Sequence, residues 1–348
     1  MNASVRAVVV HAPHDLRVED FALETPGPGE VEVAIERGGI CGSDLHYYHD
    51  GGFGTVRIKA PMVLGHEIAG RVTSVGPGVT RVSAGMRVAV DPGRACGTCR
   101  FCTRGLQAHC LEMRFFGSAM RFPHVNGGFR ERLVCSEAQA VPVKEGVGPE
   151  TAVFAEPLAV CLHAANRAGP LAGKRVLVTG CGPIGALTII VARHFGAREI
   201  VATDVAARTL GVARTVGADT ALDVAADSGA LDPFKTDKGF FDVAFECSGH
   251  KSGIADAISA VRPRGTIVQV GLGGLDVPFP LNAVVAKEID FKGTFRFYEQ
   301  FEQAVALLGS GRIDVAPLHS ATLPVERAKE AFDLASDKSQ SMKVQLAF

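Results

Sequence analysis

The sequence predicts a two-domain α/β protein in which a β-rich domain is interrupted by a doubly wound, parallel-sheet domain. The chain has 348 residues, which is more than a single core usually holds. Short β-branched segments fill its first part, and strands alternate with helices between about residues 174 and 270. Such alternation is typical of a parallel sheet with helices on both faces.

The β-rich part comes first. Its candidate strands cover residues 5–10, 31–37, 68–75 and 86–90, and turns rich in Pro and Gly at 26–29 and 76–78 separate them. This pattern favours an irregular, mostly antiparallel domain. The pattern changes near residue 156 and returns to mixed short elements after about 287. We therefore expect the β-rich domain to comprise residues 1–155 and 290–348, and the inserted domain residues 156–289.

A glycine-rich motif opens the inserted domain. The segment GCGPIG follows an apolar strand at 174–179 and precedes a helical run at 184–195, so it matches G-x-G-x-x-G in the context of a Rossmann fold. The first glycine permits the tight turn, the second lets the backbone approach a pyrophosphate, and the third lets helix and strand pack closely. An ordinary βα turn is the alternative. The predicted cofactor residues of this turn are Gly180, Gly182, Pro183, Ile184 and Gly185.

An acidic residue lies at the end of the next predicted strand. Asp204 would accept hydrogen bonds from the adenosine ribose, and its charge would repel a 2′-phosphate, which favours NAD over NADP. Arg208 lies nearby and leaves NADP possible, because an arginine there can accommodate the phosphate. Arg208 is otherwise interpreted as a solvated helix residue.

Four of the nine cysteines form the pattern C-x2-C-x2-C-x7-C. Four thiolates this close complete a tetrahedral shell around zinc, which describes a structural site. An iron–sulfur cluster is the chemical alternative. The predicted ligands are Cys96, Cys99, Cys102 and Cys110.

The net charge of the chain gives no sign of a charged partner. The 36 basic and 37 acidic residues nearly cancel, so we expect neither a nucleic acid nor a membrane surface as partner.

Residues that suit a second, catalytic metal are scattered. The segment GICGSDLH contains Cys41, Ser43, Asp44 and His46, the segment GHE contains His66 and Glu67, and AEP contains a further glutamate. Spacing alone does not assemble them. A single cysteine in a β domain is more often part of the core, and a single histidine more often a satisfied polar residue.

A family resemblance gathers these residues. The segments GICGSDLHYY, PMVLGHEIAG, the four-cysteine lobe, AEPLAV, GCGPIG with Asp204, and GTFRF occur in the order found in zinc-dependent medium-chain dehydrogenases of the sorbitol dehydrogenase branch, which the chain resembles over essentially its whole length. The resemblance implies a GroES-like catalytic domain with an inserted Rossmann domain. Within that branch, segments 113–129, 239–250 and 295–297 most resemble the group that oxidises L-idonate.

The resemblance also implies roles for individual residues. Cys41 and His66 would hold catalytic zinc together with Glu67 or Glu156, and the two glutamates could exchange. Ser43 would accept the substrate proton and pass it towards His46. The implied substrate residues are Tyr47, Phe115, Phe116, Arg296 and Phe297, with Glu156 also contacting substrate, and further implied cofactor residues are Val270, Gly271, Leu272 and Phe295.

The resulting hypothesis is a cytoplasmic enzyme that oxidises a sugar acid, L-idonate to 5-dehydro-D-gluconate, with NAD(P) as hydride acceptor. A sorbitol- or xylitol-type polyol dehydrogenase is the main alternative. A zinc-free quinone reductase would not keep Cys41, His66 and the cysteine lobe together, and a non-catalytic NAD-sensing or crystallin-like protein would need a damaged site. Phe115 and Phe116 could instead belong to the core, and Arg296 could meet the cofactor or a partner subunit. The family suggests a homotetramer or dimer.

Overall fold

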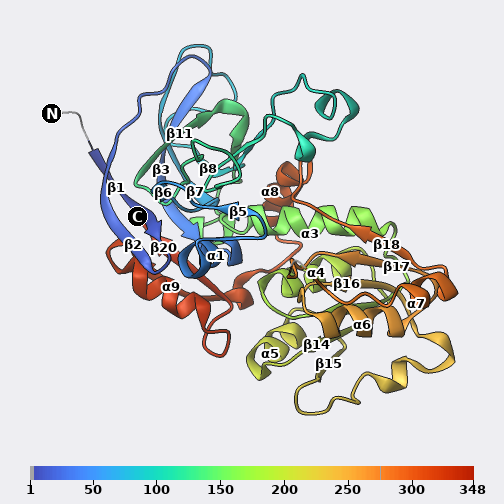
Figure 1. Ribbon diagram of the computed structural model, residues 1–348. Helices are drawn as coiled ribbons and strands as arrows, with labels where there is room; N and C mark the ends of the chain where they lie inside the picture. Colours follow the sequence, from blue (N-terminus) through green and yellow to red (C-terminus); the bar gives the residue numbers. More distant parts are fainter. Residues whose placement is uncertain (1–3, 275) are drawn as a thin grey trace.

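The computed structural model describes residues 4–274 and 276–348, and it contains two sheet systems (Figure 1). The larger, mostly antiparallel system has the strand order β12-β8-β7-β3-β20-β19, in which only β19 and β20 pair in parallel among the described strands, and β11 also pairs with β3. In β3, alternate side chains are buried along most of the strand, which is the two-residue period expected of a half-buried strand, whereas β7 begins with four consecutive buried residues. They are β3 (Glu30–Gly39), β7 (Glu67–Val75), β8 (Arg87–Val90), β11 (Arg132–Ser136), β12 (Ala140–Pro142), β19 (His319–Pro324) and β20 (Lys343–Ala347).

Smaller sheets complete this β-rich part. A three-stranded sheet has the order β2-β1-β6, and two-stranded ribbons pair β4 with β5 and β9 with β10. Short helices connect them or lie beside them. The bounds are β1 (Ser4–Ala12), β2 (Asp15–Ala22), β4 (Gly52–Phe53), β5 (Val56–Arg57), β6 (Met62–Val63), β9 (Gly93–Arg94), β10 (Arg114–Phe115), α1 (Gly42–Asp50), α2 (Pro149–Ala152) and α9 (Ala328–Ser336).

The second system is a six-stranded parallel sheet with the order β15-β14-β13-β16-β17-β18. Numbered within the sheet this is 3-2-1-4-5-6, the doubly wound dinucleotide-binding order. Strand β13 buries consecutive side chains on both faces, because helices cover both. The elements are β13 (Arg175–Thr179), β14 (Glu199–Asp204), β15 (Thr220–Asp223), β16 (Phe241–Glu246), β17 (Val261–Gln269), β18 (Asp290–Gly293), α4 (Pro183–His194), α5 (Ala207–Thr215), α6 (Lys251–Ala260) and α7 (Leu281–Lys287).

The edge strand β18 bears on the expected domain boundary at residue 290. It pairs in parallel with β17, so it lies in the parallel sheet and not with the β-rich part. With four residues and partly exposed side chains, it lacks the continuous apolar pattern that marks the other strands of this sheet. We propose placing the boundary after Gly293.

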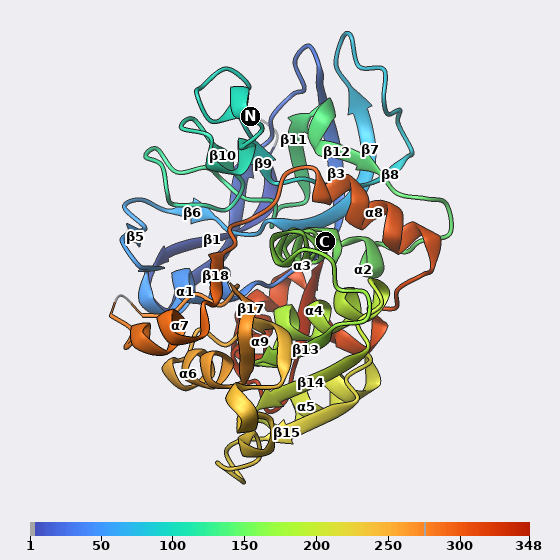
Figure 2. The ribbon, with the colours of Figure 1, turned by 90° about the vertical axis from the view of Figure 1, so that its right-hand side faces the viewer.

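Helix α3 (Ala155–Ala168) lies between the two sheet systems in both views (Figures 1 and 2). It packs on α4 and on α8 (Gln300–Ser310), and it also contacts β7 and β17. Pro157 falls in its first turn, where a missing N–H group costs nothing. Glu156 is thereby carried to the junction of the two parts. Within the described residues, no helix is long and apolar enough to cross a membrane.

Candidate active site

Three side chains with metal-ligand chemistry meet at the start of β7. The thiol of Cys41, a ring nitrogen of His66 and a carboxylate oxygen of Glu67 all lie within 4.8 Å of one another. Cys41 is the residue before α1, and His66 and Glu67 are 5% and 1% exposed. Burial raises the pKa of Cys41 to about 11, with Glu67 adding to the effect. A divalent cation would offset these buried negative charges, and one sulfur, one nitrogen and one oxygen donor fit zinc.

Asp44 ties two parts of this cluster together. Its carboxylate accepts hydrogen bonds from the backbone N–H of Cys41 at 3.0 Å and of Gly65 at 3.3 Å. The same carboxylate lies 3.7 Å from Nδ1 of His66. Such outer carboxylates orient metal-binding imidazoles. From the sequence, Asp44 is only one of the scattered candidates for the catalytic metal, although its place at the third residue of a helix beginning after Cys41 signals a capping carboxylate.

Lys343, from β20, faces the same cluster. Its ammonium donates to both carboxylate oxygens of Glu67 at 2.7 and 2.8 Å and to the carbonyl of Ile40 at 3.1 Å. Lys343 is 3% exposed. Burial opposes the charged ammonium, but Glu67, Cys41 and Glu156 together outweigh this effect, and the pKa of Lys343 is raised. Because 276 residues separate the pair, no local pattern could have revealed it.

Glu156 approaches from the first turn of α3. It is 6% exposed, and burial raises its pKa to about 8, with His66 opposing and Glu67 adding to the rise. It is not part of the three-residue cluster within 4.8 Å. The structure therefore places Glu67 with Cys41 and His66, and Glu156 beside them.

The predicted proton-relay residues lie along α1. Ser43 is half-buried in the first turn. The side chain of His46 is 53% exposed, and its Nδ1 lies 3.1 Å from a carboxylate oxygen of Asp50. Ser43 is thus two residues from Cys41 in the chain, and His46 is exposed one turn further along the same helix.

Arg296 is held in an unusual way. Its backbone has φ 53°, a left-handed conformation that non-glycine residues rarely adopt. The guanidinium carbon lies 4.0 Å from the ring centre of Phe115 and 4.9 Å from that of Phe295. Burial lowers the pKa of Arg296 to about 10, while Glu156 and Tyr47 act in the opposite direction. Among the described residues no carboxylate forms an ion pair with it, so its N–H groups remain able to bind an anion.

The five predicted substrate residues do not share one cavity. Phe115 and Arg296 line a cavity of about 320 Å³. Both residues also line a smaller, neighbouring cavity together with Phe297. Phe297 is mainly a core residue, 5% exposed, with its ring 5.7 Å from that of Phe301. The structure places Phe116 against the core of the β-rich part. Tyr47 is 2% exposed, and its hydroxyl accepts from the backbone N–H of Ala119 at 3.0 Å.

Asp91 shares the smaller cavity wall and provides a pH test. Burial raises its pKa from 3.8 to about 7, against the hydrogen bond from the N–H of Gly93. Between these two values the folded state holds a proton that the unfolded state has released, so stability falls as pH rises through this window. Asp91→Asn removes the titrating carboxyl group, so this fall in stability with pH is absent from the variant. Solvent weakens the effect because Asp91 is partly exposed. We therefore expect the free energy of unfolding of the variant to rise by about 2 kcal/mol relative to that of the wild type between about pH 4 and about pH 8, measured by urea unfolding. A constant difference would contradict the raised pKa.

The glycine-rich turn has the geometry that the motif requires. Gly180 has φ 83°, and a Cβ on it would lie 2.7 Å from the backbone nitrogen of Ser248. A Cβ on Gly185 would lie 1.8 Å from the carbonyl oxygen of Gly180. Gly182 is the residue before α4, with Pro183 and Ile184 following it in the first turn. The N-terminal N–H groups of α4 thus face the end of the sheet, where they can bind phosphate.

The adenosine end of this site lies beside β14. Asp204 accepts hydrogen bonds from the backbone N–H groups of Cys181 at 2.5 Å, Val205 at 2.7 Å and Ala206 at 3.0 Å. Arg208 is exposed and lies 3.5 Å from the hydroxyl of Ser320. The other predicted cofactor residues follow β17 and β18: Val270 and Gly271 are half-buried, Leu272 is 72% exposed and Phe295 is 39% exposed.

The four cysteines of the lobe converge. Their sulfurs lie within 4.8 Å of one another, and Cys99 and Cys102 approach to 3.5 Å. Backbone N–H groups lower the pKa of Cys99 to about 6, whereas burial raises that of Cys102 to about 12. Four thiols this close cannot all ionise without a cation, so the set fits a structural zinc with Cys96 and Cys110 as the other ligands.

Replacing one of these ligands tests the lobe. In Cys102→Ser we expect loss of one zinc ion per chain and destabilisation by about 3 kcal/mol or more, because the metal supplies the folding energy of such a loop. Metal analysis and urea unfolding measure the two effects. Thr103→Ser, a neighbouring exposed substitution, should change neither. Unchanged zinc content in Cys102→Ser would contradict the assignment.

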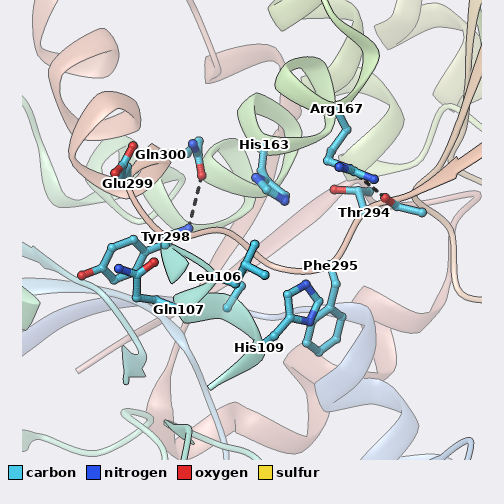
Figure 3. A pocket seen from close by; sticks show the side chains of 13 residues that line it. Leu106, Gln107, His109, His163, Arg167, Thr294, Phe295, Tyr298, Glu299 and Gln300 are labelled. Atoms are coloured by element: carbon cyan, nitrogen blue, oxygen red, sulfur yellow. Dashed lines mark hydrogen bonds between the residues drawn. The ribbon is translucent and has the colours of Figure 1, made fainter. Parts of the chain in front are cut away.

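A separate cavity of about 480 Å³ lies between the lobe, α3 and the segment after β18 (Figure 3). His163 and Arg167 reach it from α3, and His109 stacks on Phe295 with ring centres 6.0 Å apart. Arg167 donates to the carbonyl of Gly293 at 3.1 Å. Phe295 thus faces this cavity, whose described lining contains no member of the Cys41 cluster.

Comparison with known proteins places the chain in a family. Residues 27–145 match the alcohol dehydrogenase GroES-like domain, and residues 183–310 match the zinc-binding dehydrogenase family. Over its full length the chain is 43% identical to the whole of L-idonate 5-dehydrogenase (NAD(P)(+)) of Escherichia coli K12. The chain belongs to the zinc-dependent medium-chain dehydrogenases.

Further relatives support this membership of the medium-chain dehydrogenases and its sorbitol dehydrogenase-like branch. Sorbitol dehydrogenase of Gallus gallus is 37% identical over 98% of this chain and 95% of its own length. A crystal structure of L-idonate 5-dehydrogenase from Escherichia coli superposes with a TM-score of 0.96 at 42% identity, covering 100% of this chain and 99% of that one. A putative zinc-binding dehydrogenase from Sinorhizobium meliloti, bound to NADP, superposes at 0.90 with 27% identity over the whole of both chains. The predicted fold of this medium-chain dehydrogenase, a GroES-like domain with a Rossmann sheet, is confirmed.

Proposed function

We propose that this dehydrogenase oxidises a sugar acid, L-idonate to 5-dehydro-D-gluconate, with NAD or NADP as hydride acceptor. The observation that supports this most directly is a half-buried arginine, Arg296, which forms no ion pair among the described residues. It lies over the ring of Phe115, which in turn neighbours the ring of His66 in the metal-fitting cluster. A sugar acid carries both groups that this arrangement would bind, a secondary hydroxyl and a carboxylate. The full-length similarity to L-idonate 5-dehydrogenase supports the same substrate.

The catalytic metal would be held by Cys41, His66 and Glu67. A bound zinc ion would act as a Lewis acid that lowers the pKa of the substrate hydroxyl, and the nicotinamide ring would accept the hydride. The carboxylate of Asp44, 3.7 Å from Nδ1 of His66, would help to orient that ring, and Lys343 keeps Glu67 in place. The buried carboxyl of Glu156, with its raised pKa, can hydrogen-bond a water molecule or a substrate hydroxyl beside the cluster.

The substrate proton must leave a buried site. We infer that Ser43 accepts it and that His46 passes it to water, because His46 is an exposed residue of the same helix. Imidazole suits this role near neutral pH. The flanking rings of Phe115 and Phe295 limit the access of water to the guanidinium of Arg296.

The dinucleotide would lie across the carboxyl edge of the parallel sheet. The turn 180–185 and the start of α4 would bind its pyrophosphate, and Asp204 its adenosine ribose. Val270, Gly271 and Leu272 would contact the nicotinamide half. The exposed guanidinium of Arg208 leaves room for a 2′-phosphate, so both cofactors are proposed.

The decisive experiment is a substrate panel assayed with both cofactors. NADH or NADPH formation should be much faster with L-idonate than with sorbitol or xylitol. Sorbitol as the preferred substrate would replace the proposal by a polyol dehydrogenase. Tight NADH binding with no oxidation of any member, in a protein with its full zinc content, would favour a non-catalytic NAD-binding role.

Arg296→Leu tests which part of the substrate is recognised. We expect KM for L-idonate to rise about tenfold or more, because a bidentate charged hydrogen bond is lost. The weak oxidation of sorbitol, which has no carboxylate, should change by less than about twofold. Arg167→Leu, on the other cavity, is the matched control and should leave both constants near wild type. An equal loss of activity towards both substrates would show that Arg296 does not recognise the carboxylate.

We also propose a homotetramer or dimer located in the cytoplasm. Strand β18 is an open edge of the parallel sheet, and the exposed Leu281 and Val285 lie on the neighbouring helix α7. These features suit contact with a second copy. Sedimentation velocity would report the assembly, and fractionation of cells expressing the chain would report its compartment.

A further inference from the structure

Glu246 is a fully buried carboxylate for which the catalytic site gives no role. It is the last residue of β16 and is 0% exposed. It lies in register with Thr179, the last residue of β13. These two strands are the pair between which the order of the sheet reverses, and dinucleotides bind in the crevice at that point.

Five donors surround this carboxylate. One oxygen accepts from the hydroxyl of Thr179 at 3.2 Å, from the backbone N–H of Ser248 at 2.9 Å and from the hydroxyl of Ser248. The other accepts from the backbone N–H of Gly249 at 2.9 Å and from Nε2 of Gln269 at 2.5 Å. The described residues supply no cationic partner, so hydrogen bonds alone stabilise the buried group.

The loops joined in this way touch through their backbones. A Cβ on Gly180 would lie 2.7 Å from the nitrogen of Ser248, and a Cβ on Gly271 would lie 2.3 Å from the nitrogen of Gly249. A Cβ on Gly249 would lie 2.3 Å from the carbonyl oxygen of Leu272. The backbone carbonyl of the glutamate itself accepts from the N–H groups of residues 270 and 271, both at 2.8 Å. The loop 247–249 therefore lies directly between the glycine-rich turn and residues 270–272.

We propose that Glu246 is a positioning residue that fixes the loops 247–249 and 270–272 for the nicotinamide half of the dinucleotide. The inference rests on the proposed NAD-linked function. Asp204 places the adenosine half over β14, so the other half lies over the carboxyl ends of β16 and β17. The carboxylate acts beneath this second half, through backbone contacts, without touching the cofactor.

Measuring the affinity for NADH and, separately, for AMP distinguishes this positioning role from a general effect on the fold. In the zinc-loaded, full-length chain, Glu246→Gln places an amide NH2 where at least two donors point, so the loops must shift. We expect the Kd for NADH to rise about tenfold or more and the Kd for AMP to stay within about twofold. Asp242→Asn, at the opposite end of β16, is the matched control, because its carboxylate holds Arg175 and Arg262 away from the cofactor edge. It should change neither constant.

A milder variant covers the case in which Glu246→Gln does not fold. Ser248→Ala removes one hydroxyl donor from an exposed residue, and we expect about a threefold rise in the Kd for NADH with the Kd for AMP and the unfolding temperature unchanged. Equal weakening of NADH and AMP, or no change of either in a folded variant, would overturn the role of Glu246. Failure of the wild-type chain to bind either ligand would instead overturn the proposed function.

Discussion

Cys41→Ala is expected to lose one of two zinc ions per chain and to lower kcat/KM about a thousandfold or more. The thiolate is one of three donors within 4.8 Å of one another, and two donors hold zinc poorly. Without the metal, the several kcal/mol by which a Lewis acid stabilises developing negative charge are lost. Metal analysis together with steady-state kinetics on L-idonate measures both effects.

Cys135→Ala is the matched control for that change. Cys135 lies in β11, is 3% exposed, and burial raises its pKa to about 12, so it is a packing thiol. Its replacement should cost about 1 kcal/mol of stability and leave zinc content and kcat/KM near wild type. If Cys41→Ala kept two zinc ions and full activity, the catalytic metal would have to lie elsewhere.

The sequence allowed the inserted Rossmann domain to be predicted closely because its signals are local. An apolar strand, a glycine-rich turn and a helix follow one another within about twenty residues, and β13 and α4 occur where the pattern predicts them. The cysteine lobe is equally local. Strand β18 escaped notice because its four residues, two exposed and two half-buried, carry little pattern.

The catalytic cluster needed the family resemblance, because its members are distant in sequence. Cys41 and His66 come from different elements, and the chain folds back from its end to place Lys343 beside Glu67. Buried polar groups such as Asp44 and Glu246 look like ordinary acidic residues in the sequence. Their roles depend on which donors the fold brings to them, and neither periodicity nor composition records that.

Lys343→Met is expected to destabilise the protein by about 3–5 kcal/mol. The substitution keeps much of the side-chain volume but leaves Glu67, which is 1% exposed, without the cation that both its oxygens contact. Removing one partner of a buried ion pair strands the other charge, and that cost exceeds the value of the pair itself. Urea unfolding of the metal-free chain, in which no zinc ion compensates Glu67, gives the free energy.

The double variant Lys343→Met with Glu67→Gln shows where that cost arises. With the stranded carboxylate replaced by a neutral amide, the loss should be smaller than in Lys343→Met alone, although zinc affinity should fall because a ligand is gone. Lys235→Met is the control: its ammonium lies 3.0 and 3.1 Å from Asp232 and Asp256 but is partly exposed, so it should cost less than about 1 kcal/mol. A double variant at least as unstable as Lys343→Met would mean that the ammonium stabilises the fold by packing and by its bond to Ile40, and not by compensating Glu67.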